Sequence, residues 1–310
     1  QCPESDLLAL PFRLAAWGIG IRTPCAARVL CIGFLGGFAP AASAAAQAVR
    51  TGQLTAEEAD ALLPACICSG PSFVVLTVGQ SLLGSAELGV LLFASQITAN
   101  YLTAALLNRF AGVHSVEQES AAQASPAPPR LDEILADAAI TYCKLCGFIL
   151  FFRLLAAGAG ALLPTGAGTL CAILLEVCSG CDLASRTGQW GSLLCCAALS
   201  VQGLSVLLQV RTLCPPEVSL RSLLWGRLLH LPLSLALFYL GLPQSAVESF
   251  NTLCARVVPM RRVPTDCALL VFAVCCITAC KACRLTEKRH KTQLRQTKTA
   301  LRLANRRKMW

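Results

Sequence analysis

Residues 200–209 read SVQGLSVLLQ and lie inside an apolar run from Leu193 to Leu213. The segment carries two glutamines, two serines and a glycine where an uninterrupted membrane helix would carry leucine and valine. Backbone polar groups in lipid have to be satisfied within the protein. An irregular polar segment therefore survives at membrane depth only where it lines a cavity or the protein interior. Residues 200–209 thus predict a membrane helix that is broken near its middle.

The composition of the whole chain is typical of a membrane protein. Of the 310 residues, 55% are hydrophobic and 14% are charged, and the mean hydropathy is +0.62. A soluble domain carries about 25% charged residues. The apolar excess here falls in blocks of membrane-spanning length. We therefore predict an all-α polytopic membrane protein in contact with the lipid bilayer, and we exclude a soluble protein.

The net charge of +9 is concentrated at one end of the chain. From Lys281 to Trp310 there are eleven Lys and Arg residues and one acid, Glu287, so this tail carries +10 and the remainder is close to neutral. The positive-inside rule predicts that the tail is cytoplasmic. There it would anchor the topology and contact anionic lipid. A nucleic-acid-binding arm is the alternative for the tail, but the charge distribution predicts no nucleic-acid partner for the protein.

Nineteen cysteines suggest either a disulfide framework or small buried side chains. Most lie within apolar runs, where a reduced cysteine behaves as a small hydrophobic residue. Three C-x-x-C pairs occur, but the chain has only three histidines and none neighbours a pair. A zinc site requires two such pairs in a polar loop, or histidine partners. We predict reduced structural cysteines and no cofactor, with metal or redox use as the alternative. The pairs are Cys143/Cys146, Cys178/Cys181 and Cys280/Cys283.

Hydropathy and turn residues divide the chain into seven parts. The two largest share an unusual order of elements, and a long apolar helix separates them. The parts are an N-terminal interfacial segment (1–30), a first gate repeat (31–112), a polar linker (113–131), a central transmembrane helix (132–165), a second gate repeat (166–245), a loop with the last transmembrane helix (246–284) and a basic tail (285–310).

The first gate repeat contains two interrupted apolar segments. A Gly-Gly pair and Pro40 stand in the middle of a short apolar stretch, which predicts a segment that enters the membrane and turns back. Residues 62–83 are interrupted by Ser69-Gly70-Pro71-Ser72, which predicts a second broken helix because proline removes a donor and glycine permits a bend. Between them, Thr55 and Glu58 have the spacing of a capped helix start.

The two gate repeats also share short motifs. Arg50-Thr51-Gly52-Gln53 recurs as Arg186-Thr187-Gly188-Gln189, and each broken helix has a G-x-S core, Gly70-Pro71-Ser72 and Gly203-Leu204-Ser205. Asn100 and His230 fall at corresponding places. An odd number of crossings per unit would make the two units inverted repeats. Paired interrupted segments in two halves indicate the substrate site of a transporter. A duplicated scaffold without transport is the alternative.

Several further motifs resemble those of a known family. Their order and spacing over residues 5–243 resemble the YlbJ-type sporulation integral membrane proteins, which are similar to the concentrative nucleoside transporters and their gate domains. The motifs are GGFAP at 36–40, LTAEEA at 54–59, SGPSF at 69–73, TVG at 77–79, EVCSG at 176–180, GLSVLLQ at 203–209 and RLLH at 227–230.

This resemblance implies re-entrant hairpins at about 31–60 and 168–190 and broken helices at 62–83 and 192–213. It also implies secondary active transport of a small heteroaromatic anion, such as dipicolinate, or of a nucleoside-like solute during sporulation. The coupling ion would be H⁺ or Na⁺. The expected location is a cell membrane, such as the outer forespore membrane, and the expected assembly is a homo-oligomer. The chain starts at Gln1 without the family's N-terminal spans, so we expect a preceding portion.

The first half departs from the family pattern at two places. The family has Gly-Tyr-Pro in the first hairpin, where this chain has Gly37-Phe38-Ala39-Pro40, and two Asn before the Gly-Pro, where it has Ile67-Cys68. Because a hairpin tip and two polar side chains are altered, we expect the second half to carry more of the recognition.

The predicted solute site combines half-helix N-termini with polar side chains from both halves. Free N–H groups and the positive dipole ends of half-helices favour an anion. Gly70 and Gly203 would open the backbone, and Arg227 would offer a carboxylate a bidentate fork. The predicted substrate-binding residues are Ser69, Gly70, Ser72, Asn100, Glu176, Ser179, Gly180, Ser200, Gln202, Gly203, Ser205, Gln209, Arg227 and His230.

Three of these residues have other interpretations. Arg227 could reach a membrane interface, Glu176 could form a structural salt bridge, and His230 could hydrogen-bond a neighbouring helix. At the level of the whole protein, a non-transporting scaffold for assembly of the spore envelope is the alternative function. We predict that the protein is not an enzyme, because it has no His-rich or Asp-rich motif, no phosphate-cradling Gly-Lys-Ser/Thr loop and no nucleophilic serine elbow.

Overall fold

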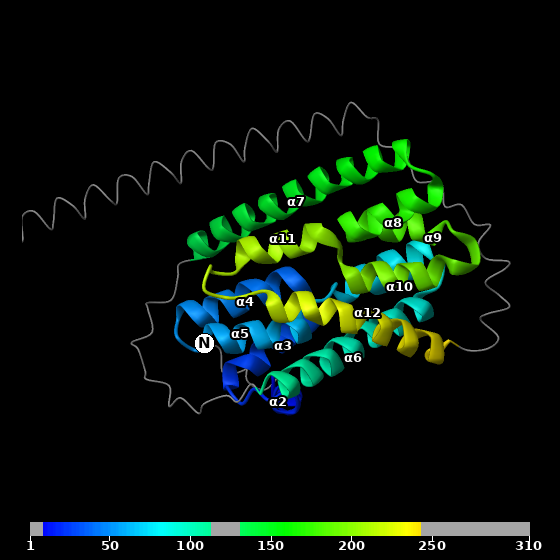
Figure 1. Ribbon diagram of the computed structural model, residues 1–310. Coiled ribbons are helices and arrows are strands. Elements are labelled where there is room, and N and C mark those ends of the chain that lie inside the picture. Colours follow the sequence, from blue (N-terminus) through cyan, green and yellow to red (C-terminus); the bar gives the residue numbers. More distant parts are fainter. Residues whose placement is uncertain (1–8, 113–130, 243–310) are drawn as a thin grey trace, which may run out of the picture. The chain divides into compact units, whose positions relative to one another are not determined.

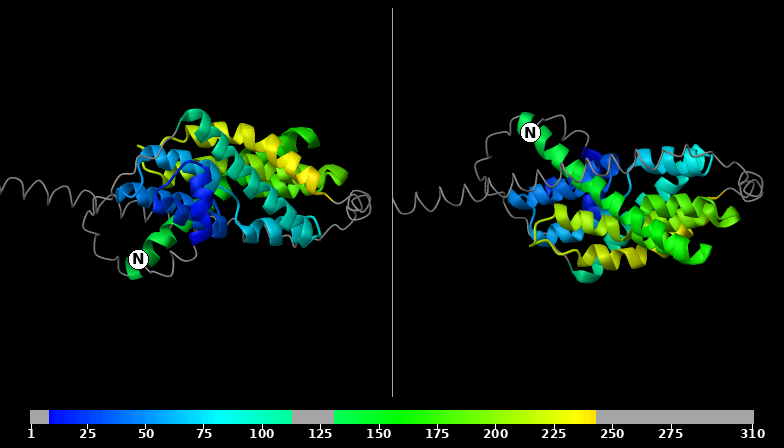
Figure 2. Two further views of the ribbon diagram at one scale, coloured as in Figure 1. Left: turned by 90° about the horizontal axis from the view of Figure 1, so that it is seen from below. Right: turned by 90° about the horizontal axis from the view of Figure 1, so that it is seen from above.

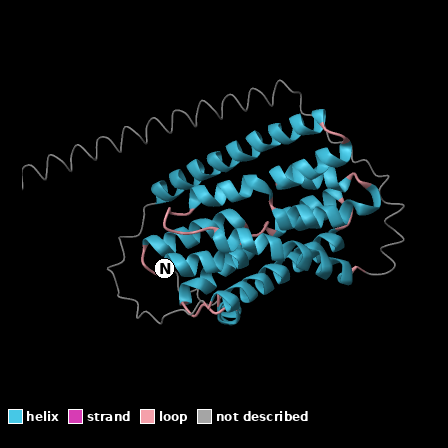
Figure 3. Ribbon diagram, viewed as in Figure 1, coloured by secondary structure: helices cyan, strands magenta, loops and turns pink. Residues whose placement is uncertain are grey.

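The computed structural model describes residues 9–112 and 131–242 (Figure 1). Within these ranges the regular elements are all helices (Figure 3). Four described segments are long and apolar enough to cross a membrane: Ala86–Ala111, Ala138–Leu162, Gly188–Leu213 and Arg221–Gly241. The predicted class, an all-α polytopic membrane protein, is confirmed. The linker, the last predicted span and the basic tail lie outside the described residues, and their predictions stay predictions.

The candidate site lies within one compact unit of the chain. Residues 9–112 and 151–242 belong to this unit, whereas residues 131–150 belong to a second one. The long helix α7 (Leu131–Leu162) begins in the second unit and ends in the first. All helices discussed below, other than α7, belong entirely to the first unit.

The first half opens with α2 (Leu10–Gly18) and a helical hairpin made of α3 (Pro24–Gly36) and α4 (Phe38–Arg50). The chain reverses at Gly37, whose φ of 83° is accessible to glycine and costly for other residues. The predicted hairpin bounds, 31–60, were wrong. The first arm starts earlier because Pro24 suits the first turn of a helix, and residues after Arg50 already lead into the next helix.

The first broken helix consists of α5 (Ala56–Cys66) and η1 (Ser72–Leu82), a π-helix. A capping box starts α5 as predicted: Glu58 N donates to Thr55 Oγ1 and Thr55 N donates to Glu58 Oε2, each at 3.0 Å. The unwound segment is residues 67–70, two residues earlier than the predicted interruption at 69–72. Pro71 has helical dihedral angles and precedes η1 directly, so it begins the second half-helix rather than ending the first. Helix α6 (Ala86–Ala111) follows.

The second half repeats this order of elements. A hairpin of α8 (Thr165–Leu175) and α9 (Val177–Ser185) turns at Glu176, so the predicted bounds of 168–190 were about right for its first arm and too long for its second. After the short η2 (Gly188–Trp190), a broken helix consists of α10 (Gly191–Val201) and α11 (Gly203–Leu213), and α12 (Arg221–Gly241) completes the half. The break predicted from residues 200–209 is confirmed at Gln202.

The repeated Arg-Thr-Gly-Gln motif forms the same turn in both halves. It follows the second arm of each hairpin, and the threonine hydroxyl donates to the carbonyl oxygen three residues earlier: Thr51 to Ala48 at 3.3 Å and Thr187 to Ala184 at 2.7 Å. The glycine that follows has a φ of 68° in both turns. Thr51 also donates to Gln47 O at 3.0 Å, a contact four residues earlier that is the shorter of its two. The two turns thus share these features, while the duplication and the inverted relation of the halves stay predictions.

Helices of the two halves pack across one another. Helix α11 of the second broken helix contacts α4 of the first hairpin, and η1 of the first broken helix contacts α9 of the second hairpin. Helix α12 lies along α6 and also contacts α5 and α10 (Figures 1 and 2). Small residues allow helices to pack closely, and on α4 Ala41, Ala42 and Ala45 are each at most 1% exposed.

Candidate functional site

The two unwound segments meet in the interior of the unit, where Arg227 of α12 joins them. Its Nη2 donates to Ile67 O at 2.6 Å and to Gln202 Oε1 at 3.0 Å, and its Nη1 donates to Ser200 O at 3.3 Å. Gln202 Nε2 also lies 3.5 Å from Ile67 O. One guanidinium group therefore links the backbone of the first broken helix to the backbone and a side chain of the second.

The surroundings of Arg227 favour an interior role over one at the membrane interface. Its hydrogen-bond partners are protein carbonyl groups and a buried amide, and its Nε is inaccessible to solvent. Among the residues that the structure describes, no carboxylate lies within ion-pair distance of this guanidinium, and Nε–H has no acceptor. The positive charge is thus held in place by neutral groups, and the buried Nε–H is left without an acceptor.

A second polar cluster connects α6, α10 and α12. Gln96 Nε2 donates to Ser200 Oγ at 3.0 Å and to Cys196 O at 3.2 Å. The hydroxyl groups of Ser200 and Ser234 are hydrogen-bonded to each other. His230 Nε2 lies 3.2 Å from Gln96 O, so this histidine pairs with a neighbouring helix, as the alternative to solute binding had it. The cluster places Ser200 next to the break and ties it to both long helices.

Two members of this cluster, Gln96 and Ser234, were missed as site residues. Both lie in apolar spans and are buried. A polar residue in a membrane span is expensive unless it faces the protein interior. The sequence thus contained a signal for both residues, a polar side chain in an apolar span. Their spacing along the chain did not show that Gln96 and Ser234 contact Ser200.

Glu176 caps the helix that follows the second hairpin tip. Its Oε1 accepts from Cys178 N at 2.8 Å, and its Oε2 accepts from Ser179 N at 2.7 Å and from Ser179 Oγ at 2.9 Å. The carboxylate is 1% exposed, and its partners are donors of its own helix rather than a salt-bridging cation. Gly180 allows the two hairpin arms to pack, because a Cβ there would lie 2.8 Å from Ile173 Cα.

Each hairpin tip packs against the break of its own half. A Cβ on Gly203 would lie 2.8 Å from Glu176 N and from Leu175 O, and a Cβ on Gly37 would lie 2.8 Å from Gly70 N. Backbone therefore touches backbone at both places. Gly203 has a φ of 70°, which agrees with its predicted role in opening the backbone. Gly70, predicted to do the same in the first half, has no positive φ. Gln202, which precedes Gly203, has a φ of 60°.

The remaining predicted residues divide by burial. On α11, Gln209 Nε2 donates to Ser205 Oγ at 2.9 Å, and both residues are 1% exposed. Ser69 and Gly70 are half-buried in the first unwound segment. Ser72 is exposed at the start of η1, so the structure does not bring it to the buried cluster.

Several buried polar atoms on α6 and α12 lack a protein partner. Both side-chain polar atoms of Asn100, the Thr103 hydroxyl and His230 Nδ1 have no hydrogen-bond partner among the described residues. Asn100 and Thr103 are each 1% exposed. Buried polar groups are almost always paired with protein, water or ligand. These unpartnered atoms on α6 and α12 are therefore available to hydrogen-bond water or the polar groups of a solute.

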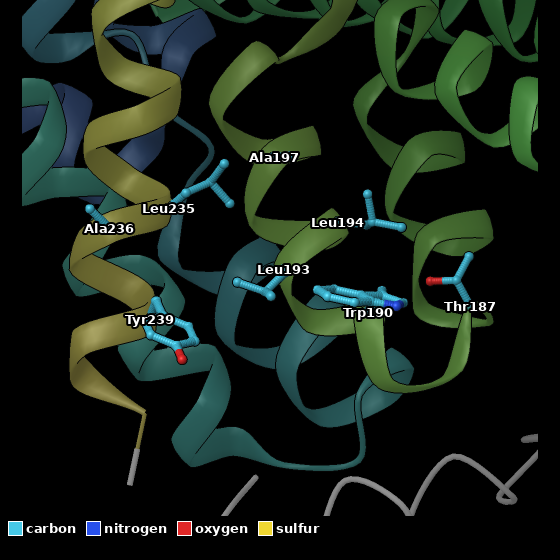
Figure 4. A pocket seen from close by; sticks show the side chains of 8 residues that line it. All are labelled: Thr187, Trp190, Leu193, Leu194, Ala197, Leu235, Ala236 and Tyr239. Atoms are coloured by element: carbon cyan, nitrogen blue, oxygen red, sulfur yellow. The ribbon is translucent and has the colours of Figure 1, made fainter. Parts of the chain in front are cut away.

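The groove in Figure 4 differs in chemistry from this interior site. It has a volume of about 570 Å³ and lies between α10 and α12, with Trp190, Leu193 and Tyr239 among its lining side chains. Thr187 also lines the groove, but its hydroxyl group already donates a hydrogen bond to Ala184 O. The groove offers an apolar wall of the kind that lipid chains cover, not polar recognition.

Metal-ligating clusters do not occur in the part of the chain that the structure describes. Most of the cysteines that the structure describes are buried, Cys66 and Cys181 among them. Cys195, for instance, donates to Cys181 O at 3.5 Å.

Comparisons with protein-family models, with curated proteins and with solved structures found no match to this chain. The resemblance to YlbJ-type proteins stays a prediction that rests on the sequence motifs.

Proposed function

We propose that this protein is a membrane transporter that moves a small heteroaromatic anion, dipicolinate-like, or a nucleoside-like solute by secondary active transport. The observation that carries the proposal is the meeting of two unwound membrane segments at a guanidinium group that no described carboxylate neutralises. Irregular backbone at membrane depth is tolerated where it lines a cavity or is covered by protein, and paired broken helices are typical of transporter sites.

The chemistry of the site favours an anionic or strongly hydrogen-bonding solute. Arg227 supplies a fixed positive charge and a free Nε–H, and Asn100 supplies unpaired donor and acceptor atoms. A carboxylate oxygen could accept from this Nε–H, and a hydrogen bond between a cation and a carboxylate is stronger than one between neutral groups. The resemblance adds the setting, a membrane of a sporulating cell, and a homo-oligomeric assembly. The positive-inside rule adds a cytoplasmic location for the basic tail.

Uptake of radiolabelled dipicolinate and of nucleosides into proteoliposomes, with and without an H⁺ or Na⁺ gradient, tests the proposal. We expect accumulation of one solute class by the wild-type protein and loss of accumulation in Gln202→Ala, Ser205→Ala and Glu176→Ala. Gln80→Ala, a change of an exposed glutamine on η1, is the matched control. Wild-type uptake by all three site variants would rule out the site. Absence of uptake by the wild-type protein, with the polar residues tolerant of substitution, would favour the scaffold function.

A further inference from the structure

The ends of the two first half-helices provide acceptors for a cation. The last carbonyl groups of a helix have no partner within it and carry the negative end of the helix dipole. Here α5 ends at Cys66 and α10 at Val201, so Ile67 O and Ser200 O belong to two such ends. In transporters with broken helices, unwound carbonyl groups and half-helix C-terminal ends coordinate Na⁺ or H⁺. The two breaks therefore form the kind of place where a coupling cation is expected.

In this structure the guanidinium group of Arg227 occupies that place. It donates to Ile67 O at 2.6 Å and to Ser200 O at 3.3 Å, which belong to different halves of the chain. The third contact, to Gln202 Oε1 at 3.0 Å, adds the side chain at the second break. A single planar cation thus satisfies acceptors of both breaks at once.

A metal ion at the same carbonyl groups would meet an unfavourable environment. Hard cations need several oxygen ligands, commonly including carboxylates. The described residues hold no cluster of acidic side chains here, and Arg227 is already within hydrogen-bond distance of the carbonyl oxygens. A second positive charge a few ångströms away would be repelled, and the repulsion is weakly screened in the interior.

We propose that Arg227 is a built-in cation that takes the place of a coupling metal ion between the two breaks, so that the breaks keep their geometry without Na⁺. This inference rests on the proposed transport function for its meaning. It also makes a statement about the chain alone: the pocket vacated by the Arg227 side chain is a binding site for a free guanidinium ion.

The test measures protein stability in detergent, not solute uptake, so its failure is distinct from failure of the transport proposal. The variant Arg227→Ala is titrated with guanidinium chloride in the low millimolar range against equal KCl. We expect a lowered Tm that guanidinium raises saturably by about 5 °C. Neither the wild-type protein nor Arg109→Ala, which removes an exposed arginine of α6, should respond.

Two results would overturn the inference. The first is a folded Arg227→Ala protein whose Tm responds to guanidinium no differently from KCl. The second is a saturable rise of the wild-type Tm with NaCl relative to choline chloride, because a Na⁺ site at the breaks would then exist beside Arg227. The wild-type measurement decides alone if Arg227→Ala does not fold. In that case a Tm that NaCl leaves unchanged supports the built-in cation.

Discussion

The two breaks of this protein have the same place in their halves but different construction. The first extends over residues 67–70 and contributes a backbone carbonyl, Ile67 O, to the meeting point. The second is confined to Gln202 and its neighbour, and contributes a side chain as well as the carbonyl of Ser200. The first break thus supplies backbone polarity alone, and the second supplies both a backbone carbonyl and a side chain. This difference supports the expectation that the second half carries more of the recognition.

The largest expected effect distinguishes the glycines of the two breaks. We expect Gly203→Ala to destabilise the protein by about 2–4 kcal/mol, because its left-handed backbone disfavours a side chain and a Cβ would meet backbone of the hairpin tip at 2.8 Å. Gly70→Ala should change stability by less than about 0.5 kcal/mol, since its Cβ would meet Gly36 only at 3.6 Å. Thermal and chemical unfolding in detergent measures both.

Gly37→Ala is the control for this pair. It should be as damaging as Gly203→Ala, because in the first half the left-handed glycine lies at the hairpin tip rather than in the break. Equal stability of Gly70→Ala and Gly203→Ala would show that the two breaks pack alike and would remove the contrast.

The next effect concerns the side chain that the second break alone supplies. Gln202→Gly removes the amide and with it the hydrogen bond to Arg227, and it also relieves the positive φ at this position. We expect a loss of about 1.5–3 kcal/mol for a bond to a charged group, offset in part by the relieved backbone, and loss of solute uptake. Cys68→Ala in the first break, which gives up only a 3.5 Å thiol contact to Gly33 O, should retain uptake. Retained uptake by Gln202→Gly would contradict recognition by the second break.

A smaller effect is expected at the hairpin tips. Glu176→Ala removes the side-chain cap of α9 and should cost about 1–2 kcal/mol, whereas the first tip has no side-chain cap to lose. Glu176→Gln retains an acceptor oxygen and should recover part of the stability. If Glu176→Gln loses uptake while its Tm matches the wild-type value, the carboxylate charge has a role beyond the cap.

The smallest effect compares the serines of the two G-x-S cores. Ser205→Ala removes a buried hydrogen bond with Gln209 and should cost about 1 kcal/mol. Ser72→Ala alters an exposed position and should stay within about 0.5 kcal/mol of the wild-type protein. Urea unfolding of the two variants side by side measures the difference. A larger cost for Ser72→Ala would place that serine in a buried contact after all.

Prediction from sequence succeeded where a local pattern has a local cause. The capping box at Thr55 and Glu58 and the break at residues 200–209 follow from neighbours in the chain, and both are present. The first break was displaced because Pro71 is compatible with either a helix end or a helix start. Gln96 and Ser234 were missed because their partners come from other helices.

The class of the protein follows from its amino-acid pattern: apolar blocks of spanning length favour helices with internally satisfied backbone, and polar interruptions force those helices to break. Tertiary structure alone decided what the interruptions do. Whether Arg227 reaches an interface or the interior depends on where Ile67 O and Ser200 O lie, and these atoms are brought to it by helices distant in sequence. The same holds for Gly203 and the hairpin tip, because the close approach of two backbones leaves no periodic signal in either segment.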